Sequence, residues 1–180
     1  MIVEIPSNCP VACICEGGAE TAIINILLDA GKLIFKSSQL IEDEPLRRTS
    51  GKEFCERYLK KDFESKVYVI RVIDSKRENF KITQQYKSKI EQVIDVVTSP
   101  EIEMLIIISE GMYDDYKNSN YKKPSEYCKS KLKIKYVKSP SYYQDKFGND
   151  VDFLIKCIKE YSRVHKQDED KATLYDLIKK

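Results

Sequence analysis

The pattern of hydrophobic and polar positions opens with a strand followed by a helix. Residues Val11–Cys15 form an apolar run of strand length, which ends at Glu16 and a pair of glycines. Apolar residues then recur at helical spacing, at Ala22, Ile23, Ile26, Leu27 and Ala30. This order predicts a buried strand, a tight turn and a helix. In an open α/β sheet, such a turn places Glu16 at the carboxyl end of a strand, where ligands usually bind.

Two later runs have the character of further strands. Val67–Ile73 is rich in β-branched and aromatic residues and is apolar except at Arg71, which is typical of a central parallel strand. It ends at Asp74, and Val93–Val97 forms a third, shorter apolar run. We therefore expect Val11–Cys15 and Val67–Ile73 to be neighbouring parallel strands.

Shorter elements fill the remainder, and the C-terminal half is predicted to be helical. We expect a strand at 32–35, a loop at 37–50, a helix through 54–59 capped by Thr49 or Ser50, and helices at 84–91, 100–110, 124–128, 150–165 and from 171. The period of 103–110 fits a strand or a helix, and we favour a helix at 100–110 because Pro100 fits its first turn and Ser99 its N-cap. There are no internal repeats, so we interpret 1–180 as one α/β domain, with a sheet core in 1–117 and a helical extension in 118–180.

The amino-acid composition indicates a globular protein but does not indicate its function. Of the 180 residues, 33% are charged and 42% hydrophobic, which fits a globular chain. The net charge of +2 provides no global basic field, so nucleic-acid binding would need a local patch. Neither a signal peptide nor a membrane-length apolar run is present, and we expect a cytoplasmic protein. The single His165 excludes a multi-histidine site, and the six cysteines are interpreted as reduced and structural.

Acidic residues follow each of the three predicted strands. These are Glu16 with Glu20, Asp74, and, after Ser99, Glu101 with Glu103. Because parallel strands end at one edge of a sheet, these carboxylates could hold Mg²⁺ or Mn²⁺ together with water and a substrate phosphate. The simpler alternative for the first pair is a glycine turn whose acids cap a helix.

Several of these segments resemble Toprim domains. The strand, Glu16-Gly17 and the acid at Glu20 resemble the opening motif of the overcoming-lysogenization-defect nucleases. Thr98–Ile108 resembles a segment of RloB-like and abortive-infection Toprim proteins, and Ala172–Ile178 resembles the terminal helix of the RloB group. The resemblance implies a mainly parallel Toprim-like sheet flanked by helices, and a metal-dependent, nuclease-like activity on DNA or RNA in phage defence or a mobile element.

The resemblance also implies roles for individual residues. Glu16 and Asp74 would hold the metal, and Glu20 would support it or act as a general base. Lys76, with Arg77, would contact a phosphate.

This chain departs from the Toprim pattern at one position. Where the family has Asp-x-Asp, this chain has Asp74-Ser75-Lys76, and Glu78 in the following loop could substitute for the second acid. An ammonium group at that position would repel a second metal ion. One alternative is therefore a catalytically degenerate module that binds nucleic acid, a partner protein or a second copy of itself. Another is an unrelated doubly wound domain that binds a nucleotide.

Two further features have competing interpretations. The lysine- and tyrosine-rich segment 117–138 could bind a phosphate backbone and stack bases, or it could be a solvated surface whose tyrosines anchor helices. Arg71, within an apolar strand, is expected to pair with a buried acid such as Asp74 or Glu16.

Overall fold

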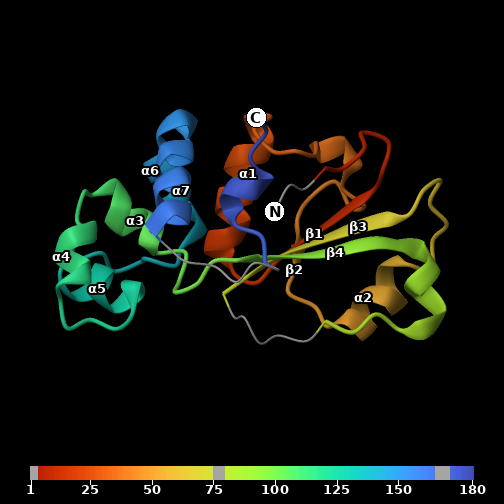
Figure 1. The fold of residues 1–180 in the computed structure, drawn as a ribbon, viewed down its shortest axis with the longest axis horizontal. Coiled ribbons are helices and arrows are strands. Elements are labelled where there is room, and N and C mark those ends of the chain that lie inside the picture. Colours follow the sequence, from red (N-terminus) through yellow and green to blue (C-terminus); the bar gives the residue numbers. More distant parts are fainter. Residues whose placement is uncertain (1–3, 75–79, 165–170) are drawn as a thin grey trace.

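A four-stranded parallel sheet forms the centre of the computed structural model, which describes residues 4–74, 80–164 and 171–180 (Figure 1). Its strands lie in the order β2-β1-β3-β4. They are β1 (Val11–Cys15), β2 (Leu46–Arg47), β3 (Val67–Ile73) and β4 (Ile90–Val97). The protein is therefore of the predicted α/β class, with an all-parallel sheet in its described residues.

Strands β1 and β3 are neighbours, as the sequence predicted. Their register pairs Val11 with Tyr68 and Cys15 with Val72. Strand β4 pairs with the other edge of β3 and begins at Ile90 rather than at the predicted Val93. The first residues of β4 are more exposed than its end, which explains why only its last part shows a continuous apolar pattern.

Helices cover both faces of the sheet (Figure 1). Helix α1 (Gly18–Asp29) packs on one face, in a core that includes Cys13 and Ile70. Helix α2 (Gly51–Tyr58) packs on the other, in a core that includes Ile14 and Val69. Because successive strand residues point to opposite faces, strands buried on both sides must be apolar throughout. Of the two predicted N-caps of α2, Thr49 and Ser50, the structure has Ser50. Its hydroxyl accepts a hydrogen bond from the Glu53 N–H.

The C-terminal half is mainly helical, as predicted. It contains α3 (Met104–Ser109), α4 (Tyr113–Lys117), α5 (Pro124–Ser130), α6 (Pro140–Phe147) and α7 (Val151–Val164). Helix α6 packs against α1 and helix α7 packs against α3, and these four helices share one core with strands β1, β3 and β4. Within the described ranges, no helix has the length and apolar character needed to span a membrane.

The predicted start of the helix at 100–110 is wrong. Helix α3 begins at Met104, its N-cap is Glu103, and Ser99 caps nothing. The Tyr161 hydroxyl donates to the carbonyl of Ser99 at 2.8 Å and lies 3.4 Å from that of Glu101. These contacts hold residues 99–101 in an irregular conformation before the helix, which no local pattern indicates.

Four shorter predictions also need correction. Residues 32–35 form no strand of the sheet, because Leu33 makes only an isolated antiparallel bridge to Ile178. The predicted loop at 37–50 contains the edge strand β2 and a 3-10 helix at Ser37–Gln39. The helix expected at 84–91 is a 3-10 helix at Gln84–Lys89, after which the chain enters β4. The terminal helix from 171 is a 3-10 turn at Leu174–Leu177, since Ala172 bridges to Val96 at the edge of β4.

Candidate functional site

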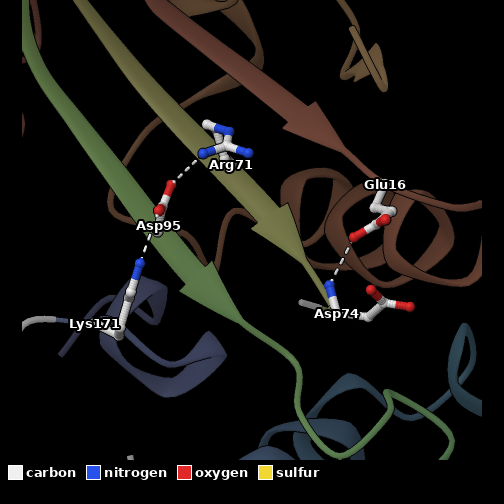
Figure 2. Close-up of polar contacts among 5 residues, drawn as sticks. All are labelled: Glu16, Arg71, Asp74, Asp95 and Lys171. Atoms are coloured by element: carbon white, nitrogen blue, oxygen red, sulfur yellow. Dashed lines mark hydrogen bonds and ion pairs between the residues drawn. The ribbon is translucent and has the colours of Figure 1, made fainter. Parts of the chain in front are cut away.

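The carboxyl ends of β1 and β3 bring two predicted site residues together. Glu16 directly follows β1 and Asp74 directly follows β3. The N–H of Asp74 donates to Oε2 of Glu16 at 2.8 Å, as Figure 2 shows. This contact follows from the register, because the pairing of Cys15 with Val72 carries both chains to the same edge of the sheet. The two residues therefore lie at the same edge of the sheet, as the parallel strands predicted.

A small cavity of about 200 Å³ lies at this edge of the sheet. Its acidic lining residues come from the β1–α1 turn, the end of β3 and the segment before α3. The residues that line it are Glu16, Gly17, Gly18, Ala19, Glu20, Asp74, Glu101, Ile102, Glu103 and Lys138. The structure thus gathers five of the predicted acids into one pocket, hereafter the acidic pocket.

The glycines of the turn allow two elements to approach closely here. A Cβ on Gly18 would lie 2.8 Å from Cγ of Pro140, the first residue of α6, and 3.8 Å from the carbonyl oxygen of Lys138. A Cβ on Gly17 would lie 2.8 Å from Oε2 of Glu20. The absence of side chains at these positions lets the segment before α6 reach the pocket and lets the Glu20 carboxyl fold back over the turn.

Glu20 has the strongest electrostatic signature among the acids of the pocket. Its side chain belongs to the first turn of α1, and the residue is only 7% exposed. Burial raises the pKa of Glu20 to about 7, although its own backbone N–H opposes the shift. The charges of Glu103, Asp74 and Glu16 contribute to the same rise. At neutral pH this carboxyl is therefore close to half protonated.

Two neighbouring acids are perturbed in the same direction. Burial is the largest cause of the raised pKa of Glu103, and the charges of Glu101 and Asp74 add to it, against an opposing contribution from Lys138. Burial also raises the pKa of Glu16, where the N–H of Asp74 opposes the shift and the Asp74 carboxyl supports it. The acidic pocket thus concentrates negative charge in a partly dry setting.

Two cations from distant segments partly balance this charge. Nη1 of Arg48, just after β2, lies 2.8 Å from Oε1 of Glu16. Nζ of Lys138, before α6, lies 3.7 Å from Oε1 of Glu103. No sequence pattern indicated Arg48 as a site residue, because it follows a two-residue strand in a stretch predicted as a loop. Lys138 belongs to the lysine-rich segment, but nothing local linked it to the acids.

The other predicted site residues have different positions. Ser99 does not line the pocket, and its carbonyl accepts from Tyr161. Glu101 lines the pocket, and its Oε2 also accepts from the N–H of Ser125 at the start of α5, at 2.8 Å. The predicted phosphate contacts and the substitute acid, namely Lys76, Arg77 and Glu78, lie outside the described residues.

Arg71 pairs with an acid, as predicted, but that acid is Asp95 rather than either of the two suggested, Asp74 and Glu16. Its Nη1 lies 2.9 Å from Oδ1 of Asp95, the residue directly opposite on β4, as Figure 2 shows. Oδ2 of Asp95 accepts from Nζ of Lys171 at 3.0 Å, and the Arg71 guanidinium lies over the Phe80 ring, 4.5 Å from its centroid. Register within the sheet, rather than nearness in sequence, selected the partner.

The tyrosines of the lysine-rich segment mostly support helices. Tyr127 is buried, and its hydroxyl donates to Asp115 at 2.7 Å. The rings of Tyr116 and Tyr121 meet its ring edge-on, with centroids 5.3 and 5.5 Å away. Tyr136, in contrast, is 75% exposed. Anchoring therefore accounts for Tyr127 and its neighbours.

The donors of the acidic pocket suit a hard cation, but they do not form a complete cage. Across residues 4–74, 80–164 and 171–180, no group of three or more His, Cys, Asp or Glu side chains lies close enough to hold a metal ion. Mg²⁺, however, is commonly bound by one or two carboxylates together with water and substrate phosphate. The pocket fits that sparse mode of binding through Glu16 and Asp74.

Comparison of the chain with protein-family models, with curated proteins and with solved structures finds no significant match. Membership of the Toprim family therefore stays a prediction, based on the short motifs around Glu16, Asp74 and Thr98–Ile108. The function has to be inferred from the geometry and charge of the acidic pocket.

Proposed function

We propose that the acidic pocket binds Mg²⁺ or Mn²⁺ and that the protein acts on nucleic-acid phosphodiesters, as a nuclease-like enzyme. The observation that carries the proposal is the cluster of Glu16, Glu20, Asp74 and Glu103, in which the burial of Glu20 and repulsion from the other three acids raise the pKa of Glu20 to about 7. A bound divalent cation would relieve this repulsion. A role in phage defence or a mobile element, which the Toprim resemblance implies, belongs to the same proposal.

Within this proposal, each residue has a task that its position supports. Glu16 and Asp74 would hold the cation, because they meet at the ends of β1 and β3. The cation would polarise a phosphoryl oxygen and offset the developing negative charge. Glu20 is suited to accept a proton near neutral pH, since a base is most effective when its pKa is close to the working pH.

Cation binding and cleavage can be tested with matched variants. Mn²⁺ would be titrated into wild type, Glu16→Gln, Asp74→Asn and the control Glu42→Gln, whose carboxylate pairs with Lys61 outside the pocket. We expect both pocket variants to lose roughly tenfold or more in affinity, in line with the effect of disturbing metal sites, while the control matches wild type. The same proteins would be assayed with Mg²⁺ and Mn²⁺ on single- and double-stranded DNA and RNA. Equal Mn²⁺ affinity in all four proteins would overturn the proposal.

A second candidate is a module that binds nucleic acid without cleaving it. It is favoured by the lack, among the described residues, of three metal-ligating side chains close together. In this case wild type would bind the nucleic-acid panel equally well with EDTA or Mg²⁺ and would cleave none of it. Lys76→Asp, which restores the acid that the Toprim pattern has at this position, would then be the variant expected to gain metal-dependent cleavage.

A further inference from the structure

The ion pair between Arg48 and Glu16 holds the oxygen that a cation would need. Oε2 of Glu16 accepts from the N–H of Asp74, so the backbone fixes this carboxylate in place. Oε1 is 2.8 Å from Nη1 of Arg48. A metal ion that binds Glu16 through Oε1 would lie directly beside the guanidinium, and because the two cations repel each other they compete for this oxygen.

The two partners of this pair differ in how firmly the structure holds them. The Glu16 side chain is 14% exposed, whereas that of Arg48 is 59% exposed. Arg48 follows the edge strand β2, whose last residue, Arg47, is in register with Cys15, so its backbone stays beside Glu16 whatever its side chain contacts. Ion pairs with one well-solvated partner contribute little to stability, so breaking the pair with Glu16 costs little in itself.

We propose that Arg48 exchanges partners when the pocket is loaded. Without a cation, it neutralises Glu16; when Mg²⁺ or Mn²⁺ binds Glu16, the guanidinium is released and contacts the phosphate of the substrate. The inference rests on the proposed function and adds a specificity-determining residue to it. It also gives the phosphate of the nucleic-acid substrate two positive contacts, the bound cation and Arg48.

The chemistry of arginine suits this role better than that of other side chains. A guanidinium is always charged and presents a planar fork of N–H donors that matches carboxylate and phosphate alike. Arg48 can therefore move from the carboxylate of Glu16 to a phosphate without changing its mode of bonding. Lys138 is similarly exposed, at 63%, beside the buried Glu103, but its Nζ is 3.7 Å from the carboxylate and holds it less closely.

The first prediction is that loss of the Arg48 guanidinium strengthens Mn²⁺ binding, because the two compete for Glu16. Free Mn²⁺ would be followed by electron paramagnetic resonance during titration of wild type, Arg48→Gln, Arg47→Gln and Glu16→Gln. Arg48→Gln should bind Mn²⁺ roughly threefold more tightly than wild type, because a weak ion pair no longer competes. Arg47→Gln is the control, because it removes one positive charge from the adjacent residue without breaking the pair with Glu16. Its Mn²⁺ affinity should stay near that of wild type.

The second prediction is that Arg48 contacts the phosphate of DNA only when the metal ion is bound. Binding of a short dye-labelled single-stranded DNA would be measured by fluorescence anisotropy, in saturating Mn²⁺ and in EDTA. In Mn²⁺, Arg48→Gln should bind the DNA about tenfold more weakly than wild type, which corresponds to the loss of a charge-assisted contact. In EDTA the two proteins should bind equally, because Arg48 then remains on Glu16.

The outcomes separate this inference from the proposed function. The exchange is wrong if Arg48→Gln behaves like Arg47→Gln in both assays, or if it binds Mn²⁺ more weakly than wild type. Loss of Mn²⁺ binding in Glu16→Gln would still support the cation site in that case. If Glu16→Gln binds Mn²⁺ as wild type does, both the site and the exchange are wrong. If Arg48→Gln weakens DNA binding equally in Mn²⁺ and EDTA, Arg48 is a constant phosphate contact and the exchange is excluded.

Discussion

At the residue scale, Glu20 should make the stability of this protein depend on pH. Its pKa is raised from 4.5 to about 7, so the folded state holds this proton more tightly than the unfolded state does. The stabilisation is fully present below about pH 4.5 and is lost as the pH rises through 7. We expect the free energy of unfolding to fall by up to about 3 kcal/mol across this window, since one pKa unit corresponds to about 1.4 kcal/mol.

Urea denaturation of wild type and Glu20→Gln at about pH 5 and pH 8 checks this expectation. The variant should lose most of the slope, because glutamine does not titrate, while Glu42→Gln should keep it. The raised pKa values of Glu16 and Glu103 add a residual slope of the same sign. An unchanged slope in Glu20→Gln would show that this carboxyl titrates normally.

The ion pair between Arg71 and Asp95 makes a second prediction at this scale. The Arg71 side chain is 5% exposed, so Asp95→Ala would leave a nearly buried charge without this partner and would remove the same counter-charge from Lys171. We expect a loss of about 3 kcal/mol or more in the free energy of unfolding. Glu42→Ala, which breaks the exposed pair with Lys61, should cost less than about 1 kcal/mol in the same denaturation series.

At the element scale, the start of α6 packs closely against the turn between β1 and α1. Gly18→Ala would place its Cβ 2.8 Å from Cγ and 3.2 Å from Cδ of Pro140, which forces the two elements apart. We expect a loss of roughly 1–3 kcal/mol, as for other overpacked contacts, together with weaker cation binding because Lys138 and Glu20 shift.

A double-mutant cycle tests the cause of that loss. Pro140→Ala removes the ring atoms that Gly18→Ala would meet, so Gly18→Ala should cost less in the Pro140→Ala background than in wild type. Thermal unfolding of the four proteins measures the coupling. Strict additivity of the two substitutions would mean that the cost arises within the turn itself and not from its contact with α6.

At the scale of the whole molecule, the last residues close the fold across two distant regions. The N–H of Val97 donates to the carbonyl of Ala172, and the N–H of Ile34 donates to that of Leu177. Leu174, Leu177 and Ile178 are buried in the core beside α1. The segment 171–178 therefore ties the end of β4 to the chain after α1.

Deletion of residues 171–180 should consequently unfold the protein. The three apolar side chains alone contribute roughly 1.5–3 kcal/mol each through burial, which is a large part of the stability of an ordinary domain. Removal of Lys179 and Lys180 alone is the matched control and should cost about 1 kcal/mol or less, since both residues are exposed. Thermal unfolding of the two truncated proteins would be followed by circular dichroism. A cooperative transition near the wild-type temperature in the protein that lacks 171–180 would contradict this expectation.

The sequence by itself determined the elements whose signals lie within a few residues. The apolar runs at Val11–Cys15 and Val67–Ile73 predicted the two central strands, and the acids that follow them predicted Glu16 and Asp74 at one edge of the sheet. The helical spacing after Gly18 and at 150–165 likewise predicted α1 and α7. These features follow from burial on each face of an element, which local periodicity records directly.

Only the tertiary structure decided which residues from distant segments meet. Strand β2 has two residues and no usable pattern, yet it carries Arg48 to Glu16. Sheet register gave Arg71 the partner Asp95, and the packing of α6 on α1 brought Lys138 to the acids. The physical reason is that pairing across the sheet and helix packing are set by the sum of many contacts between distant segments, and no short stretch of sequence contains that sum.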